Sequence, residues 1–451
     1  MGSFLSKASS TNPSTPEQQQ RLHVAIIGAG IGGLGLAIAL NNQHVSYTIY
    51  ESAAEYATVG AGIGIGPNAM QAMDLLDERF RGKYDAICIG NLTFGKEKVM
   101  MEACLLEDGL GAKRGWLPRP WGSSIYKRTA AHRKTLLDIM TNFIPKNTIK
   151  FNKRVASAIE KSEGVELRFE DGETAFANAV IGCDGVKGFS RGYVLGSRFP
   201  EEVQARYIGQ YAYRAVVPIQ DARDILGDLA DDAKMYFGHR ANLSTYVISE
   251  GREINVVGFI QDCHSKAWAD PNRAVREVTR EQMLEDFTSH NTDNRLLKLL
   301  DATQWAMFHH PQTSTYHNGL VCLLGDSAHA TLPNQAAGAG QGLEDAVIMS
   351  RVLGKVDSEL RGAKSPQPVA AKVVAAFEAY DSIRRPRAQR QIDTSIECGQ
   401  LYNMTHPEIG QDMEKTMDNL NGRFEWLWGH DLRKDIELAL EQYALLVTQK
   451  Q

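Results

Sequence analysis

Three glycines and an acidic residue near the amino terminus form the clearest chemical pattern in this sequence. Gly28, Gly30 and Gly33 follow a short apolar run at residues 24–27, and Glu51 ends the next β-like run at 46–50. In this spacing the first glycine permits a tight turn, the second lets backbone approach a pyrophosphate, and the third brings helix and strand together. The helix amino terminus then binds the phosphates and the acid binds a ribose. The pattern predicts a dinucleotide site.

A second pattern lies at residues 320–346. An apolar run at 320–324 leads to Asp326, then to Pro333, and then to a glycine-rich helix start that includes Gly338 and Ala339. A carboxylate at a strand end can bind a ribityl hydroxyl. A glycine-rich helix start offers free N–H groups and the positive end of the helix dipole. These groups suit a ligand that carries negative charge, as a reduced flavin does at N1 and its C2 carbonyl.

The elements that would position these residues change along the chain. The apolar runs at 24–27 and 46–50, with a helical run at 34–40 between them, predict one βαβ unit. The middle predicts an antiparallel sheet, followed by a helical stretch over 281–300, and its β-rich runs lie at 205–219, 234–238, 243–249 and 253–262. From about residue 369 onward the periodicity is helical.

The bulk composition excludes several classes of function. A chain of 451 residues is too long for one compact core, so two or more domains are expected. The net charge of −5, without a block of like charge, argues against nucleic acid as a partner. The six cysteines stand singly, so neither a metal site nor a dithiol redox centre is predicted.

The ends and the apolar runs bear on location. No apolar run approaches the roughly 20 residues that span a bilayer, so no transmembrane segment is expected. Residues 1–21 are polar and predict a disordered tail rather than a signal peptide. Single cysteines favour a reducing, cytoplasmic setting. Gly2 and Ser6 also fit the N-myristoylation pattern, although so short a pattern recurs by chance.

Together these motifs resemble the class A flavoprotein monooxygenases, the family of para-hydroxybenzoate and salicylate hydroxylases. The nearest likeness is to its fungal branch of salicylate-hydroxylase-like and dearomatising phenol hydroxylases. Besides the two glycine patterns, the likeness rests on His132-Arg133-x-x-Leu136-Leu137 and on Cys183-Asp184-Gly185 followed by Arg191, and it spans about residues 22–390. The resemblance implies FAD as the cofactor, bound through Gly28, Gly30, Gly33, Glu51, Gly62, Arg133, Asp184, Asp326, Pro333, Gly338 and Ala339.

The resemblance also implies an α/β fold. We expect a glutathione-reductase-type Rossmann FAD domain, an inserted antiparallel β-sheet substrate domain and a helical carboxyl-terminal region. We place the tail at 1–21, the FAD domain at 22–82, 120–200 and 315–365, the substrate domain at 83–119 and 201–314, and the helical region at 366–451.

The activity implied is hydroxylation of an electron-rich phenol, with decarboxylation or dearomatisation in some relatives. In the family NAD(P)H reduces the flavin transiently, and O₂ then forms a C4a-hydroperoxide that delivers oxygen to the ring. An FAD-dependent epoxidase or other oxidoreductase acting on an alkene or indole is the alternative, and a flavin-binding protein without catalysis is a third. The substrate, the ring position, NADH against NADPH, and a monomer against a homodimer stay open.

Arg214 and Tyr246, in the β-rich middle, are the candidate substrate-binding residues. They resemble the arginine and tyrosine that anchor the phenolate in the dearomatising branch, and a guanidinium can hold a phenolate or ortho-carboxylate with two hydrogen bonds. The alternative is a surface arginine and a core tyrosine. The histidines at positions 239, 309 and 310 are interpreted as structural.

The sequence departs from the family pattern at two places. Gly188 stands where a serine is usual, which predicts the loss of one nucleotide-side contact. Asn334-Gln335-Ala336 replaces the usual His-Gln-Gly in a loop that lies near the reactive edge of the flavin in the family. The second change leaves the cofactor prediction intact but makes the substrate class uncertain.

Overall fold

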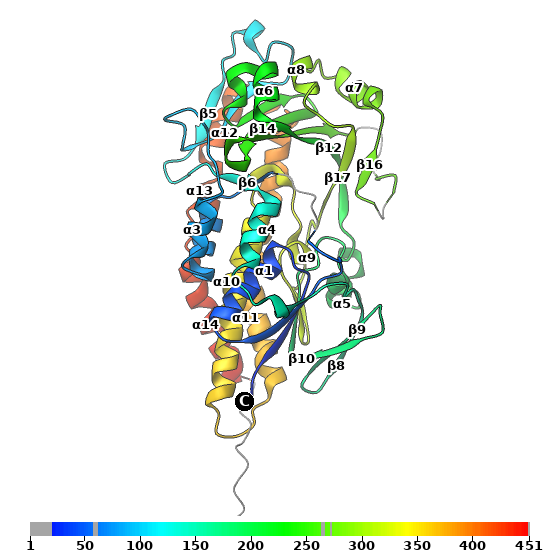
Figure 1. Cartoon of the computed structure of the whole chain (residues 1–451), viewed down its shortest axis with the longest axis vertical. Coiled ribbons are helices and arrows are strands. Elements are labelled where there is room, and N and C mark those ends of the chain that lie inside the picture. Colours follow the sequence, from blue (N-terminus) through cyan, green and yellow to red (C-terminus); the bar gives the residue numbers. More distant parts are fainter. Residues whose placement is uncertain (1–19, 57–61, 263–266, 271–272, 450–451) are drawn as a thin grey trace, which may run out of the picture.

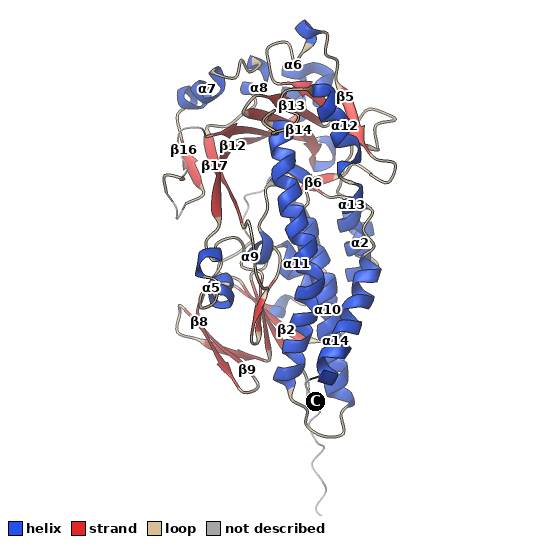
Figure 2. Cartoon of the chain, turned by 180° about the vertical axis from the view of Figure 1, so that it is seen from behind, coloured by secondary structure: helices blue, strands red, loops and turns tan. Residues whose placement is uncertain are grey.

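The computed structural model describes residues 20–56, 62–262, 267–270 and 273–449. The myristoylation pattern at Gly2 and nearly all of the predicted tail lie outside these residues. The molecule is elongated, with one large sheet toward each end and long helices running between them (Figures 1 and 2). Within the ranges described, no helix combines the length and the apolar character needed to cross a membrane.

The lower sheet in Figure 1 carries the glycine fingerprint. All its neighbouring strands run parallel except the pair at one edge, β18 (His317–Asn318) with β19 (Val321–Leu323), which is antiparallel. Four of the five residues of β1 are buried, as a strand covered on both faces requires. The predicted βαβ unit is confirmed by two of these strands and by helix α1 (Ile31–Asn42). In spatial order the strands are β18 (His317–Asn318), β19 (Val321–Leu323), β11 (Ala179–Gly182), β1 (His23–Ile27), β2 (Ser46–Tyr50) and β7 (Ile149–Lys150).

The upper sheet has eight strands, and one of its faces lines a cavity. Its pairs are antiparallel except β13 with β4, which run parallel. In spatial order the strands are β16 (Val275–Glu277), β17 (Thr303–His309), β12 (Arg206–Pro218), β15 (Glu253–Gln261), β14 (Ala241–Ile248), β13 (Lys234–Gly238), β4 (Val99–Leu105) and β5 (Arg119–Gly122).

Two small sheets complete the β-structure. One is formed by β10 (Thr174–Ala177), β9 (Gly164–Phe169) and β8 (Val155–Lys161). The other pairs β3 (Gly62–Gly64) with β6 (Ala130–His132) and lies between the two large sheets.

Alternation along β12 gives the upper sheet two different faces. Tyr211 and Tyr213 point to the outer face, where both hydroxyls donate to Asp286 of helix α7 (Arg280–Thr288), at 2.7 and 2.6 Å. Ala212 and Arg214, one residue out of step, line a cavity on the inner face. Since side chains alternate along a strand, this register directs Arg214 toward the other half of the molecule.

The predicted helix over residues 281–300 is wrong in its extent. The structure has α7 (Arg280–Thr288), a turn with Asn291 at φ +50°, and the short α8 (Asn294–Leu297). Asp293 begins α8 because its carboxylate accepts a hydrogen bond from the Arg295 N–H at 2.9 Å. A helix start therefore interrupts the apolar periodicity.

The carboxyl-terminal region is helical, as predicted. Helix α11 runs from the lower sheet to the upper one, beside α10 and α14 (Figure 2). The long helices are α10 (Gly338–Gly362), α11 (Val369–Tyr402), α12 (Met413–Arg423) and α14 (Leu432–Gln449). The remaining helices are α2 (Pro67–Leu76), α3 (Phe80–Asp85), α4 (Arg133–Thr141), α5 (Phe189–Leu195), α6 (Ile219–Leu226), α9 (Asp326–His329) and α13 (Glu425–Trp428).

Candidate active site

The three fingerprint glycines are required for different reasons. Gly28 has φ +99°, and a Cβ there would collide with the Cys183 carbonyl. A Cβ on Gly33 would collide with the carbonyl of Gly28 in the same way. Around Gly30, by contrast, a Cβ would meet no heavy atom of the described chain within 4 Å. The protein itself therefore excludes side chains at Gly28 and Gly33, whereas Gly30 keeps space free for a ligand, as a pyrophosphate needs.

Glu51 is fixed next to this space. One oxygen accepts the Ala29 N–H at 2.8 Å and the other accepts the Ala53 N–H at 2.8 Å. The oxygen bound to Ala53 also accepts the Ser52 hydroxyl at 3.3 Å, whereas the oxygen bound to Ala29 keeps a second lone-pair direction, so the group can still accept a hydrogen bond from a ribose. These residues fit the adenosine half of a dinucleotide.

Asp326 and Asp345 belong to the same glycine-rich region, but only Asp345 is hydrogen-bonded to other residues of the described chain. Asp345 accepts hydrogen bonds from the Gly325 N–H at 3.0 Å and from Arg384 Nε at 2.8 Å, and its Oδ2 lies 2.5 Å from His329 Nε2. The Asp326 carboxylate has no hydrogen bond to the described part of the chain. Its side chain is accessible to solvent. The protein that surrounds the carboxylate displaces part of its hydration and so raises the pKa of Asp326, while the charges of His329 and Arg133 oppose this shift. Asp326 is thus free to bind ligand hydroxyls.

Asp184 explains the first departure from the family pattern. Its Oδ2 accepts hydrogen bonds from both the N–H and the hydroxyl of Ser190, each at 2.9 Å. A Cβ on Gly188 would collide with this carboxylate. Glycine at 188 therefore leaves room for Asp184, and a serine two residues later supplies the hydroxyl. Burial raises the pKa of Asp184, whose buried Oδ1 has no hydrogen-bond partner among the residues described.

Arg191, which follows the Asp-Gly motif, turns away from these groups. Its buried guanidinium donates to backbone carbonyls, among them Glu202 at 2.7 Å and Ser327 and Ala328 at 3.0 Å. It ties α5 to the segment that carries Asp326, so its role is to hold the site together.

A cavity of about 170 Å³ lies between the inner face of the upper sheet, strand β3 and the loop after Pro333. An apolar cavity of about 150 Å³ can hold one benzene ring, so this volume suits a compact aromatic molecule. No acidic residue is among the residues that line it, and four of them are methionines. The lining residues are Gly62, Gly64, Met100, Met101, Arg128, Ala212, Arg214, Met235, Ser244, Tyr246, Val257, Phe259, Met307, Pro333, Asn334 and Ala336.

Arg214 brings a positive charge to this cavity without a protein counter-charge. Its guanidinium lies over the Trp305 ring at 5.2 Å, and it has neither an ion pair nor a hydrogen bond to the residues that the structure describes. Burial lowers the pKa of Arg214, and the nearby Arg133 adds to this effect. Arg214 is only half-buried, but holding a cation partly out of water without a partner is still costly, and an anion in the cavity would offset that cost.

Tyr246 lines the same cavity, but its hydroxyl is already engaged. It donates a hydrogen bond to the Gly62 carbonyl at 3.0 Å, while the Gly62 N–H donates to Asn255 Oδ1 at 3.0 Å. The two side chains therefore hold Gly62 from both sides. Burial raises the pKa of Tyr246, while the charges of Arg128 and Arg214 oppose that shift.

Sequence reasoning missed Arg128. Its guanidinium lies 4.9 Å from the centre of the Tyr246 ring and donates to the Met100 carbonyl at 3.2 Å. A signal was present, because Arg128 precedes the recognised His132-Arg133 pair on the same extended segment. The four lining methionines, which we call the methionine wall, gave no comparable signal, since they come from three strands that are far apart in sequence, β4, β13 and β17.

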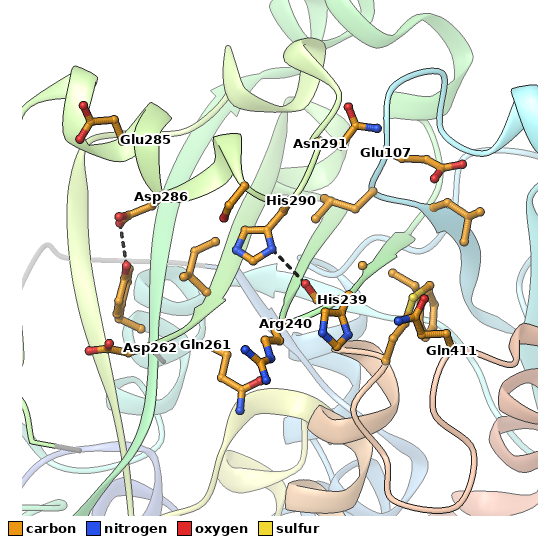
Figure 3. A pocket seen from close by; sticks show the side chains of 18 of the residues that line it. Glu107, His239, Arg240, Gln261, Asp262, Glu285, Asp286, His290, Asn291 and Gln411 are labelled. Atoms are coloured by element: carbon orange, nitrogen blue, oxygen red, sulfur yellow. Dashed lines mark hydrogen bonds between the residues drawn. The ribbon is translucent and has the colours of Figure 1, made fainter. Parts of the chain in front are cut away.

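A larger cavity, of about 750 Å³, lies at the ends of the upper-sheet strands (Figure 3). Asp262 and Asp286 lie on one side of it, and His239 and Gln411 on the other. None of the predicted FAD or substrate residues is among its lining residues.

Burial lowers the pKa of His310 to about 3 and also lowers that of His309, which agrees with a structural role for both.

Comparison with known proteins decides the family. The FAD binding domain family matches residues 21–395. The chain belongs to this family. It is 44% identical over 433 residues to an FAD-dependent monooxygenase of Gibberella moniliformis, covering 94% of this chain and 97% of the relative. It is 33% identical to the 6-methylsalicylate 1-monooxygenase of Aspergillus terreus, covering 95% and 93%. A solved salicylate hydroxylase substrate complex superposes with a TM-score of 0.80 at 29% identity, covering 94% of this chain and 98% of that one.

These findings confirm the predicted fold class, cofactor and enzyme class. The protein is an FAD-dependent monooxygenase of the salicylate hydroxylase type, for which NAD(P)H is the usual reductant. The structure agrees with FAD as the ligand, because it leaves space beside Gly30 and gives the Asp326 carboxylate no hydrogen-bond partner among the described residues. The roles of the individual residues, and the domain bounds, stay predictions.

Proposed function

We propose that this monooxygenase hydroxylates a compact phenol that binds in the 170 Å³ cavity as its phenolate or through an adjacent carboxylate, with Arg214 as the anchor. The observation that carries the proposal is the uncompensated charge of Arg214 in a cavity without acidic lining residues. An alkene or indole would leave that charge unpaired, so the anionic phenol is favoured over the epoxidase alternative. The name of the Aspergillus terreus relative, a 6-methylsalicylate monooxygenase, is in line with such a substrate.

The residues divide the work as follows. Bound FAD, once reduced by NAD(P)H, would activate O₂, so that one oxygen atom of O₂ is transferred to the ring and the other leaves as water. Gly28, Gly30, Gly33 and Glu51 hold its adenosine half, and Asp326 binds a ribityl hydroxyl. Arg214 stabilises negative charge on the substrate oxygen, which makes the ring electron-rich at the positions where oxygen is accepted. The methionine wall and Phe259 keep water away from the reacting atoms, which suppresses loss of the activated oxygen as H₂O₂.

The test measures how tightly reductant use is linked to product. Arg214→Ala should lower kcat/KM for the best phenol by roughly ten- to a hundredfold, the value of a charge-assisted hydrogen bond, and shift NAD(P)H oxidation toward H₂O₂. Arg214→Lys should lose much of the same activity, because it keeps the charge but not the planar fork. FAD content should stay at the wild-type level in both variants. The panel should contain salicylates, resorcinols and acyl-phenols.

Arg276 provides a matched control. It too lies over a tryptophan, Trp268, at 5.1 Å, but it is exposed on β16 and does not line the cavity. Arg276→Ala should keep the wild-type ratio of product to reductant. If Arg214→Ala keeps that ratio as well, at pH values on both sides of the phenol pKa, the anchor must lie elsewhere.

A further inference from the structure

We propose that Ala336 sets the size of the substrate that this enzyme accepts. Its methyl group is held in the cavity by a left-handed backbone conformation and narrows the space opposite Gly64. The inference rests on the proposed function, because it concerns the same cavity. It assigns a role to a residue that departs from the family pattern.

The backbone of Ala336 is under strain. Its φ of +51° and ψ of 34° lie in the left-handed region, where a Cβ crowds the following carbonyl and glycine is unhindered. Other non-glycine residues of the described chain share a positive φ, His44 and Asn152 among them, but Ala336 alone of that set lines the 170 Å³ cavity. Strain of this kind, when kept at a functional site, points to a use for the side chain that causes it.

The loop cannot relax away from the cavity, because α11 holds it from behind. Asn334 Nδ2 donates to the Ser395 carbonyl at 2.9 Å, and the Tyr402 hydroxyl donates to the Asn334 carbonyl at 3.1 Å. A Cβ on Gly399 would come within 2.5 Å of Asn334 Nδ2, so α11 leaves room for this side chain. The conformation of the loop is therefore imposed from outside.

The Ala336 methyl group faces the cavity and is not covered by protein side chains of the core. Ala336 is exposed, although the residues on either side, Gln335 and Ala337, are buried. A Cβ added to Gly64 of β3 would lie 3.3 Å from the Ala336 Cβ. The two residues thus face each other across a narrow part of the cavity, where one carbon more or less changes the width available to a ring substituent.

Ala336→Gly removes both the strain and the methyl group. The holoenzyme should gain about 1–3 °C in unfolding temperature, as expected when a left-handed residue becomes glycine in a chain of this length. Phenols with one more carbon in the ring substituent than the best wild-type ligand should bind more tightly by about tenfold, which is the value of one methylene in a fitted pocket. Binding is read from the change in the flavin absorbance spectrum, without turnover.

His44→Gly is the matched control. His44 has φ +56° in an exposed turn between α1 and β2, away from the cavity. It should raise the unfolding temperature by a similar amount and leave the ligand series unchanged. If Ala336→Gly also leaves the ligand series unchanged while its stability rises, Ala336 is a strained turn residue only and the proposal is wrong. If the wild type binds phenols in graded fashion but hydroxylates none, the proposed function fails and the size role of Ala336 is still decided by binding.

Discussion

Two arginines, Arg384 on α11 and the half-buried Arg214 on β12, are both at least partly withdrawn from water, but their surroundings are opposite. Arg384 is fully buried and pairs with Glu344 and Asp345, each at 2.8 Å. Arg214 has a tryptophan ring and no carboxylate within the described ranges. Burying a charge is tolerated when a partner compensates it. An arginine whose charge is compensated by buried carboxylates therefore has a structural role, whereas an arginine without a counter-charge at a cavity is available to a ligand.

The pKa values of the two groups follow the same division. Burial by itself would lower the pKa of Arg384, but the charges of Glu344 and Asp345 outweigh it and raise the pKa. For Arg214 burial prevails, and the pKa is lowered. The environment of Arg384 thus favours its charged form. The environment of Arg214 disfavours the charged form, and an anion bound beside it would offset this effect.

The largest effect is expected when a carboxylate is removed from the buried ion pairs of Arg384. Asp345→Asn removes a carboxylate that serves Arg384, His329 and the Gly325 N–H. Taking one partner from a buried ion pair costs about 3–5 kcal/mol of stability when the other charge is left uncompensated. Because Arg384 keeps Glu344 as a partner, we expect a cost at the lower end of that range, about 3 kcal/mol. Denaturant unfolding of the holoenzyme measures this cost. The exposed pair of Lys134 with Asp138 is the control, since Asp138→Asn should cost at most about 0.5 kcal/mol. A loss below about 1 kcal/mol for Asp345→Asn would contradict the assigned structural role.

The same region sets the response to acid. Burial would raise the pKa of Glu344, but Arg384 and Arg387 overcome it and lower the pKa from 4.5 to about 2. A depressed carboxyl stabilises the fold above its unfolded pKa and loses that contribution as the pH falls toward its folded pKa. Stability should therefore decline between about pH 4.5 and 2. Glu344→Gln should flatten the decline in that window, whereas a variant as steep as the wild type would show that other carboxyls control it.

Much of this organisation could be predicted from the sequence, and the limits have a physical cause. The fingerprint glycines and Glu51 lie within one βαβ unit, so local spacing defines their geometry. The pairing of Asp345 with Arg384 joins residues 39 apart on two helices, and no local pattern indicates it. Arg214 was identified by resemblance, but its lack of a counter-charge emerges only when the seven strands and two connecting segments that line the cavity come together. The strain at Ala336 was hidden because its loop conformation is imposed by α11.

The comparison extends to carboxylates: Asp345 is buried and paired, whereas Asp326 is exposed, and we propose that it faces FAD. Asp326→Ala should weaken FAD binding by roughly ten- to a hundredfold, since a charge-assisted hydrogen bond is worth about 1.5–3 kcal/mol. Unfolding of the apoprotein should be unchanged, because the described chain gives this side chain no hydrogen-bond partner. Titration of apoprotein with FAD checks the first statement, and Asp326→Asn, which keeps an acceptor oxygen, should fall between. Wild-type FAD affinity in Asp326→Ala would remove this residue from the site.

The smallest effect is expected at Tyr246, which lines the cavity as Arg214 does but is hydrogen-bonded within the protein as Arg384 is. Its hydroxyl has one hydrogen, and that hydrogen is donated to the Gly62 carbonyl, so sharing the substrate oxygen would require this bond to break. We therefore expect Tyr246 to position β3 rather than to hold the phenolate. Tyr246→Phe should lower kcat/KM by less than about tenfold, the value of a neutral hydrogen bond.

A double-mutant cycle with Arg214→Ala decides between these two roles. If Tyr246 acts through Gly62, the free-energy effects of the two changes on kcat/KM should add to within about 0.5 kcal/mol. If both side chains bind the same substrate oxygen, the loss of one should alter the contribution of the other, and the coupling should exceed that limit. Strong coupling would return Tyr246 to the substrate anchor predicted from the sequence. Additivity would leave Arg214 as the anchor and make Tyr246 part of the frame that holds Gly62 beside the cavity.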